Sequence, residues 1–242
     1  LGRIRAAIES RFEAVASPEG VEITLEVNPS TVERERLPGF REAGVNRLSV
    51  GIQSFDDAVL HRLGRAHRAE ENHRSWRAAR EAGFENLSLD LIFGAPGGSA
   101  RQLERDLELA REARPEHVSI YQLTVEPQTP FDLARRRGQL ALPSEEEAVE
   151  ALERIVAALD GAGLARYEIS NFARPGFESR HNQRYWSREP VLGLGVGAVT
   201  NEPASDEAPF GLRRSNRREW KGYLEGVEAG RGAAAEVEGL DA

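Results

Sequence analysis

Three apolar segments of the chain each carry, near their C-terminal end, a polar side chain able to bind a ligand. These side chains are Glu26 in segment 21–27, Gln53 in segment 46–53 and Asp90 in segment 86–93. Carboxylates accept hydrogen bonds, and an amide both donates and accepts them, so such a set suits the hydroxyl and amino groups of a polar ligand. The alternative is structural, with the three side chains capping the fold or pairing with loop arginines. Their recurrence on successive segments favours the binding site.

Two further features suggest ligand chemistry. Arg65 lies in the loop region after segment 46–53, where its guanidinium could bind a carboxylate through two hydrogen bonds. In so arginine-rich a chain, composition alone favours the alternative, a solvated side chain. His181 lies with Asn182, Tyr185 and Trp186 in a polar-aromatic cluster. Imidazole is an axial ligand of haem iron, and the two aromatic rings could stack on a flat ligand. The alternative is a structural loop histidine.

The segments that carry these side chains read as β-strands with two different faces. Side chains alternate across a strand, so Leu48, Val50 and Ile52 oppose Ser49, Gly51 and Gln53. We expect strands near 21–27, 46–53, 86–93 and 117–125, and helices near 31–43, 69–82, 99–113 and 144–161. The apolar face of the strands would pack against the helices, and the polar face would form a binding surface.

Helix signals and a short internal repeat order these elements. Ser30, Ser99 and Ser144 each precede Glu or Gln by three residues, which predicts capped helix starts. Segments 41–49 and 80–88 share the pattern Arg-Glu-Ala-Gly followed by Leu-Ser. Repeated helix–strand units predict a parallel sheet. A doubly wound sheet would bury both strand faces, so the one-sided pattern favours a partial (β/α) barrel with an open, polar interior.

The remaining sequence predicts a smaller, different region. We expect a barrel part over 1–163, opened by an amphipathic helix with Leu1, Ile4, Ile8, Phe12 and Val15 on one face, and a mixed α+β extension over 164–242. The extension should contain a strand at 167–170, a helix near 215–229 and a frayed tail after Gly230.

Composition excludes several classes of protein. A net charge of -8 over 242 residues argues against a general nucleic-acid binder, and no apolar run is long enough to span a membrane. The chain has no cysteine, which excludes disulfides, a cysteine nucleophile, cysteine zinc sites and a self-contained iron–sulfur cluster. It has no methionine and starts at Leu1, so we expect a fragment of a longer protein. Without a visible signal peptide, we expect a cytoplasmic location.

Long motifs resemble a known family. Segments 22–29, 47–55, 64–67, 90–97 and 119–123 resemble the radical S-adenosylmethionine (SAM) family of oxygen-independent coproporphyrinogen oxidases and their relatives. Segments 167–172 and 181–186 resemble the haem chaperone branch of that family more than the oxidases. The likeness covers roughly residues 20–200. It implies a partial (β/α)6 radical SAM barrel that here lacks its first strands.

The resemblance also implies cofactors and roles. Glu26, Gln53, Arg65 and Asp90 match SAM-contacting positions. Arg65 would pair with the methionine carboxylate, Asp90 and Gln53 with ribose hydroxyls, and Glu26 with the ribose or the amino group. His181 matches the haem-associated motif, with Asn182, Tyr185 and Trp186 beside it.

These matches imply a haem chaperone that binds haem and SAM and transfers haem to haem-dependent proteins. The alternative is an oxygen-independent coproporphyrinogen III oxidase, and an unrelated barrel enzyme is a third reading. The family's cysteine motif for a [4Fe–4S] cluster is absent from this sequence, so we expect the cluster only in the full-length protein and no radical chemistry from this chain. Homodimerisation is left open.

Overall fold

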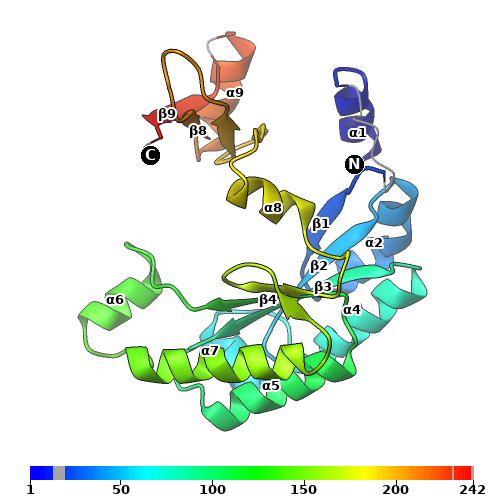
Figure 1. The fold of residues 1–242 in the computed structure, drawn as a ribbon, viewed down its shortest axis with the longest axis vertical. Coiled ribbons are helices and arrows are strands. Elements are labelled where there is room, and N and C mark those ends of the chain that lie inside the picture. The colour runs from blue at the N-terminus through cyan, green and yellow to red at the C-terminus, as the bar shows by residue number, and fades with distance from the viewer. Residues whose placement is uncertain (13–19, 231, 241–242) are drawn as a thin grey trace. The chain divides into compact units, whose positions relative to one another are not determined.

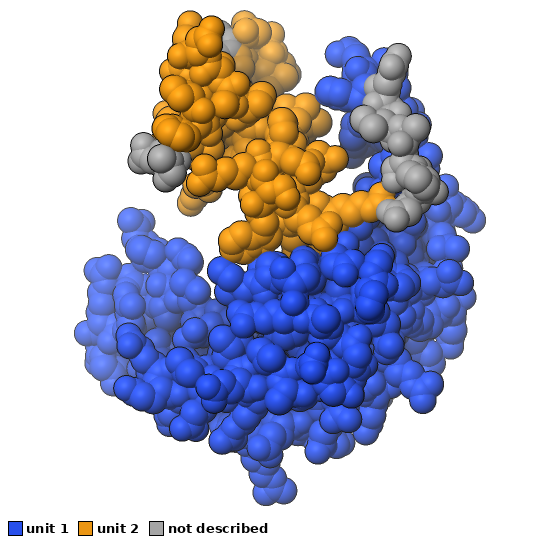
Figure 2. Space-filling model, in the orientation of Figure 1, with its two compact units in different colours: residues 1–178 blue, residues 179–242 orange. Residues whose placement is uncertain are grey.

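The chain forms two compact units, residues 1–178 and 179–242 (Figure 2). The computed structural model describes residues 1–12, 20–230 and 232–240. The division falls later than the expected boundary after residue 163, because the hairpin over residues 165–173 pairs with the sheet of the first unit.

A six-stranded sheet forms the centre of the first unit (Figure 1). Its strands are β1 (Thr24–Val27), β2 (Arg47–Gln53), β3 (Asn86–Phe93), β4 (His117–Gln122), β5 (Ala165–Arg166) and β6 (Asn171–Ala173). Strands β1 to β4 are parallel neighbours, and β6 joins β4 antiparallel with β5 at the edge, giving the order β1-β2-β3-β4-β6-β5. The predicted α/β architecture with a mainly parallel sheet is confirmed.

The predicted strand at 167–170 is wrong. These residues connect β5 to β6, and Arg166 fixes the connection by donating to the carbonyl oxygens of Glu168 and Ile169. The backbone N–H of Ile120 on β4 donates to the carbonyl of Ser170. The apolar and β-branched residues that suggested a strand therefore lie beside one instead.

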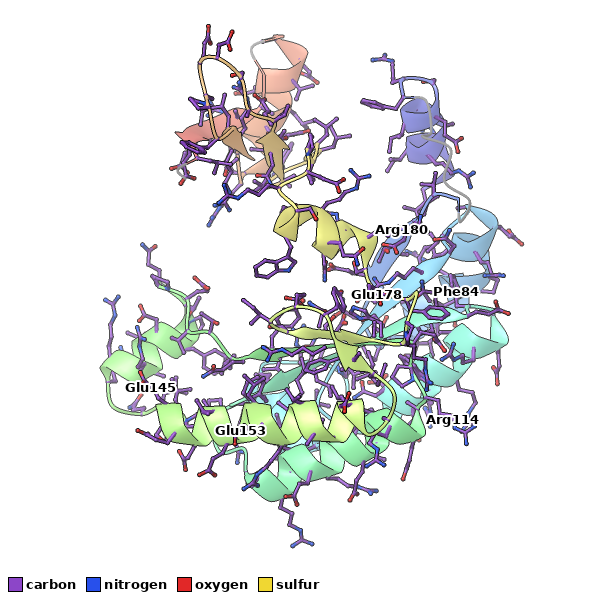
Figure 3. All side chains as sticks on the ribbon, in the orientation of Figure 1. Phe84, Arg114, Glu145, Glu153, Glu178 and Arg180 are labelled. Atoms are coloured by element: carbon purple, nitrogen blue, oxygen red, sulfur yellow. The ribbon has the colours of Figure 1, made fainter. Side chains whose placement is uncertain are left out.

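Helices follow the strands as the repeat predicted. They are α1 (Gly2–Glu9), α2 (Thr31–Glu42), α3 (Asp57–Arg62), α4 (Ala69–Glu81), α5 (Ala100–Glu112), α6 (Pro130–Arg136) and α7 (Glu145–Asp160). The hydroxyls of Ser30, Ser99 and Ser144 accept the third helical N–H of α2, α5 and α7, so all three predicted caps are confirmed. Glu145 and Glu153 lie on the exposed side of α7 (Figure 3), whose buried side carries Ile155 and Leu159.

The apolar core lies between one face of the sheet and these helices. Leu48, Leu87, Leu89 and Phe172 are fully buried there, each contributing roughly 1.5–3 kcal/mol to stability. Helix α1 lies outside this core. It is shorter than the predicted amphipathic helix, and of the apolar side chains predicted on one face, Leu1, Ile4, Ile8 and Phe12 are exposed, whereas Val15 lies outside the described residues.

The second unit is smaller and antiparallel. It contains α8 (Arg180–Trp186), β7 (Val199–Glu202), β8 (Leu212–Asn216), α9 (Trp220–Glu228) and β9 (Ala234–Gly239), with sheet order β7-β8-β9. The helix predicted near 215–229 starts only at Trp220, because Ser215 and Asn216 belong to β8. The expected frayed tail is also wrong, since residues 234–239 pair with β8. No helix in the described parts of the chain is long and apolar enough to cross a membrane.

Candidate functional site

Asp90 lies on the polar face of β3, held by hydroxyl groups. The Ser49 hydroxyl from β2 lies 2.9 Å from Oδ1 and 2.8 Å from Oδ2 of Asp90, and the Ser88 hydroxyl donates to Oδ1 at 2.9 Å. Asp90 keeps part of its surface accessible, yet burial raises its pKa to about 6, against the serine hydrogen bonds and the positive charge of Arg47. The carboxylate is thus ionised at pH 7 but close to titration.

Gln53 ends β2 in an unusual backbone conformation. Its φ is 65°, a left-handed value that non-glycine residues adopt at a cost. Its amide lies over Gly51, since a Cβ at position 51 would be 2.8 Å from Nε2 of Gln53 and 3.4 Å from Oδ1 of Asn28. The glycine therefore makes room for the Gln53 amide beside the residue that follows β1.

Buried polar groups hold the backbone on both sides of Gln53. The Asn72 amide donates to the carbonyls of Ile52 at 3.3 Å and Ser54 at 2.8 Å. The Asp106 carboxylate accepts the Phe55 N–H at 2.7 Å and the Ser54 hydroxyl at 2.8 Å. Burial raises the pKa of Asp106 to about 6, and these hydrogen bonds oppose the rise.

Sequence reasoning missed these supporting residues, although weak signals exist. Ser49 and Ser88 occupy equivalent places in the internal repeat, which puts them opposite each other in β2 and β3. Asp106 interrupts the buried stripe of α5 between Leu103 and Leu107. A carboxylate in an apolar helix stripe indicates a buried partner but does not identify it.

Glu26 and Arg65 lie on two other elements of the first unit. The β1–β2 register pairs Glu26 with Ser49, the residue that donates to Asp90. Arg65 lies between α3 and α4, two residues before the buried His67, whose Nε2 is 3.4 Å from the Ile52 carbonyl. Burial lowers the pKa of His67, so a neutral ring fastens this loop beside the end of β2. No described contact joins Arg65 to Glu26, Gln53 or Asp90.

Three of the four predicted side chains keep their full hydrogen-bonding capacity. Within the described residues, the side chains of Glu26, Gln53 and Arg65 make no hydrogen bond or ion pair to another residue. With Asp90, the set offers carboxylates for hydroxyl or amino groups, an amide, and a guanidinium for an acid. It suits a ligand that combines hydroxyl, amino and carboxylate groups.

The second unit carries the predicted haem residues on α8. His181 and Tyr185 are one helical turn apart, with ring centroids 5.0 Å apart and ring planes at 84°. Asn182 and Trp186 form the adjacent pair, and Trp186 is 58% exposed. His181 is also exposed, so its imidazole is accessible. A groove in this unit is lined by residues that include Tyr185, Arg188, Asn201, Glu202, Phe210 and Arg213.

The described part of the chain offers no multi-ligand metal site. Among the described residues no three His, Asp or Glu side chains come together as metal ligands, and the sequence contains no cysteine.

Comparison with known proteins identifies the family. Residues 3–110 match the family model described as "Radical SAM superfamily". The chain is 45% identical over 177 residues to "Heme chaperone HemW" of Bacillus subtilis (strain 168), covering 73% of this chain and 47% of the relative. It is 39% identical over 208 residues to the protein of the same name in Synechocystis sp. (strain ATCC 27184 / PCC 6803 / Kazusa), covering 86% and 49%.

The chain belongs to the radical SAM superfamily. Its similarity to these relatives supports the HemW-type branch. The solved structure of coproporphyrinogen III oxidase (HemN) from Escherichia coli matches 99% of this chain and 55% of its own, with a TM-score of 0.75 and 24% identity. This likeness confirms the radical SAM type of α/β fold. The chain spans about half the length of the curated relatives it matches.

The radical SAM family implies SAM and a [4Fe–4S] cluster. The unpartnered Gln53 amide over Gly51, the hydroxyl-held Asp90 and the unpartnered Arg65 fit a ligand with hydroxyl and carboxylate groups. The cluster does not fit the residues present, because cluster ligation uses thiolates and the sequence has none.

Proposed function

We propose that this chain is part of a haem chaperone. In this proposal, α8 of the second unit holds haem through His181, the polar face of the first unit binds SAM, and haem passes to haem-dependent proteins. The exposed, accessible His181–Tyr185 pair on α8 carries the proposal, together with 38–45% identity to proteins named heme chaperone. A cytoplasmic location, heme-protein partners and homodimerisation remain predictions.

The chemistry of the second unit supports haem as the ligand. A haem supplies an iron that takes an imidazole and two propionates that need cationic partners. His181 supplies the imidazole, and Tyr185 and Trp186 offer aromatic surface beside it. Arg188 and Arg213 line the groove that Tyr185 also lines, where guanidinium groups suit carboxylates.

The first unit supports SAM through the four matched residues. Asp90 would accept ribose hydroxyls, Gln53 would bond the same sugar, and Arg65 would pair with the amino-acid carboxylate. Glu26 would take the ribose or the amino group. These residues bind and orient the ligand, and no reaction step is assigned to them.

Haem titration of the 242-residue chain tests the haem site. Replacing His181 with alanine should remove the imidazole-dependent Soret shift and weaken haem binding by about tenfold or more. The matched control is His61→Ala, because His61 is an exposed histidine of the other unit. An unchanged spectrum and affinity in His181→Ala would refute the assignment.

An oxidase acting on coproporphyrinogen III is the second candidate. The fold likeness to HemN favours it, but at 24% identity this likeness concerns the fold alone. Anaerobic incubation of that porphyrinogen with cluster-loaded, full-length protein separates the candidates. Decarboxylated product would favour the oxidase, and its absence with retained haem binding would favour the chaperone.

A further inference from the structure

A chain of hydrogen bonds runs behind Asp90 across three elements. Ser88 Oγ is 2.9 Å from Oδ1 of Asp90 and 2.8 Å from Nδ1 of His117 on β4. Nε2 of His117 is 2.8 Å from the hydroxyl of Tyr167, in the connection between β5 and β6. Ser88 and His117 are fully buried, so these groups depend on one another for partners.

The single hydroxyl proton of Ser88 fixes the direction of the chain. An ionised Asp90 can only accept, so Ser88 must donate to it and must itself accept from His117 Nδ1–H. Nε2 of His117 then carries no proton and accepts from the Tyr167 hydroxyl. All three donors point toward Asp90.

The charge state of His117 agrees with this arrangement. Burial, and then the positive charge of Arg47, lower the pKa of His117 to about 3, so the ring is neutral at pH 7. A neutral imidazole has one donor and one acceptor nitrogen, as the chain requires. The other groups that act on Asp90 are the hydroxyls of Ser49 and Ser119, whose hydrogen bonds lower its pKa, and Arg47, whose positive charge lowers it as well.

We propose that Tyr167 and His117 act through Ser88 as positioning residues that keep Asp90 ionised and oriented as a hydrogen-bond acceptor. This inference rests on the proposed SAM site, in which Asp90 accepts ribose hydroxyls. When Asp90 is protonated, the direction of these hydrogen bonds reverses. Asp90 then donates to Ser88, Ser88 donates to Nδ1 of His117, and the Nε2–H of His117 donates to the Tyr167 oxygen. The carboxyl group then has one fewer acceptor position for a ligand.

Removing the Tyr167 hydroxyl from the hydrogen-bond network tests the inference. Tyr167→Phe deletes the hydroxyl that donates to Nε2, so His117 no longer needs its proton on Nδ1 and Ser88 can turn its hydrogen toward the ring. The titration midpoint of Asp90, followed by carboxyl ¹³C NMR of the 242-residue chain without ligand, should rise by about one pH unit. Ser88→Ala, which removes the direct donor, should raise it at least as much.

The matched control is Tyr121→Phe. Tyr121 is a tyrosine of β4 whose hydroxyl accepts a hydrogen bond from Asn171 at 3.4 Å. It takes no part in the hydrogen bonds that link Tyr167, His117, Ser88 and Asp90. Its removal should leave the Asp90 midpoint unchanged. Equal midpoints in wild type, Tyr167→Phe and Tyr121→Phe would overturn the inference.

Calorimetric titration with SAM at pH 5 to 8 gives the second readout. Wild-type affinity should fall as pH drops through the Asp90 midpoint, and Tyr167→Phe should move this fall to higher pH by the same amount as the midpoint. A pH-independent affinity would overturn the link to the ligand. If the wild type binds no SAM at any pH, the proposed SAM site fails, and the midpoints alone still decide whether the chain controls Asp90.

Discussion

Replacing Asp106 with asparagine should remove part of the pH dependence of stability. Asp106 is buried on α5 and accepts hydrogen bonds from the Phe55 N–H and the Ser54 hydroxyl. Its pKa is about 6 in the folded chain, mainly because of burial, and about 3.9 in an unfolded one. Folded chains therefore bind more protons in this range, and stability falls as pH rises through it.

The size of the effect follows from the two pKa values. Each tenfold difference in proton affinity corresponds to about 1.4 kcal/mol, so the ionised Asp106 costs about 3 kcal/mol in full. Roughly 2 kcal/mol of this develops between pH 4 and pH 7, because the unfolded carboxyl is already half ionised near pH 4. Asparagine keeps the shape of the side chain without its charge. Between pH 4 and pH 7, the free energy of unfolding of the variant should therefore rise by about 2 kcal/mol relative to that of wild type.

Urea denaturation at half-unit steps of pH measures the difference. Asp90 and His117 also titrate, but they are present in both proteins and cancel in the comparison. The control is Asp160→Asn at the exposed end of α7, whose difference from wild type should change by less than about 0.5 kcal/mol. A difference for Asp106→Asn that is flat with pH, or that falls as pH rises, would refute the reasoning.

Three further outcomes are expected. Phe172→Ala should destabilise the chain by about 3–5 kcal/mol in thermal or urea unfolding, because the ring is fully buried. Phe12→Ala should not, because Phe12 is exposed, and equal destabilisation by the two variants would contradict the packing. Gly51→Ala should leave stability within about 1 kcal/mol of wild type but weaken SAM binding, because the new Cβ displaces the flexible end of the Gln53 side chain. Unchanged calorimetric affinity would count against SAM binding at the Gln53 amide. Arg65→Lys should weaken SAM binding by about tenfold, because an ammonium cannot form the two parallel hydrogen bonds to a carboxylate; equal affinity would exclude that pairing.

The regular part of the fold could be predicted from local patterns. Alternation in segment 46–53 and the serine caps identify strands and helices because both depend on neighbouring residues. The wrong prediction at 167–170 has a different cause. Those residues suit a strand locally, but they form the connection between β5 and β6, and of them the Ser170 carbonyl accepts a backbone hydrogen bond from Ile120 on β4. Ser215 and Asn216 likewise follow their partners in β7 and β9.

The candidate site was only half visible in the sequence. Glu26, Gln53 and Asp90 stand out because each is a polar residue in the C-terminal half of an otherwise apolar segment. Their supports do not, because contacts such as Phe55–Asp106 and His117–Tyr167 join residues about 50 positions apart. His117 shows no metal-ligand spacing in the sequence. The structure shows that it is buried and connected to Asp90 through the hydroxyl of Ser88.

The left-handed backbone of Gln53 lowers stability, whereas its side chain is predicted to bind the ligand. Glycine adopts such a φ without strain, so Gln53→Gly should stabilise the chain by roughly 1 kcal/mol in urea unfolding while deleting the amide that lies over Gly51. A library selected for thermal resistance alone should drift to glycine at position 53. A library selected for SAM retention should return to glutamine. If both selections recover the same residue at position 53, the backbone conformation does not cost stability that the side chain offsets through SAM binding.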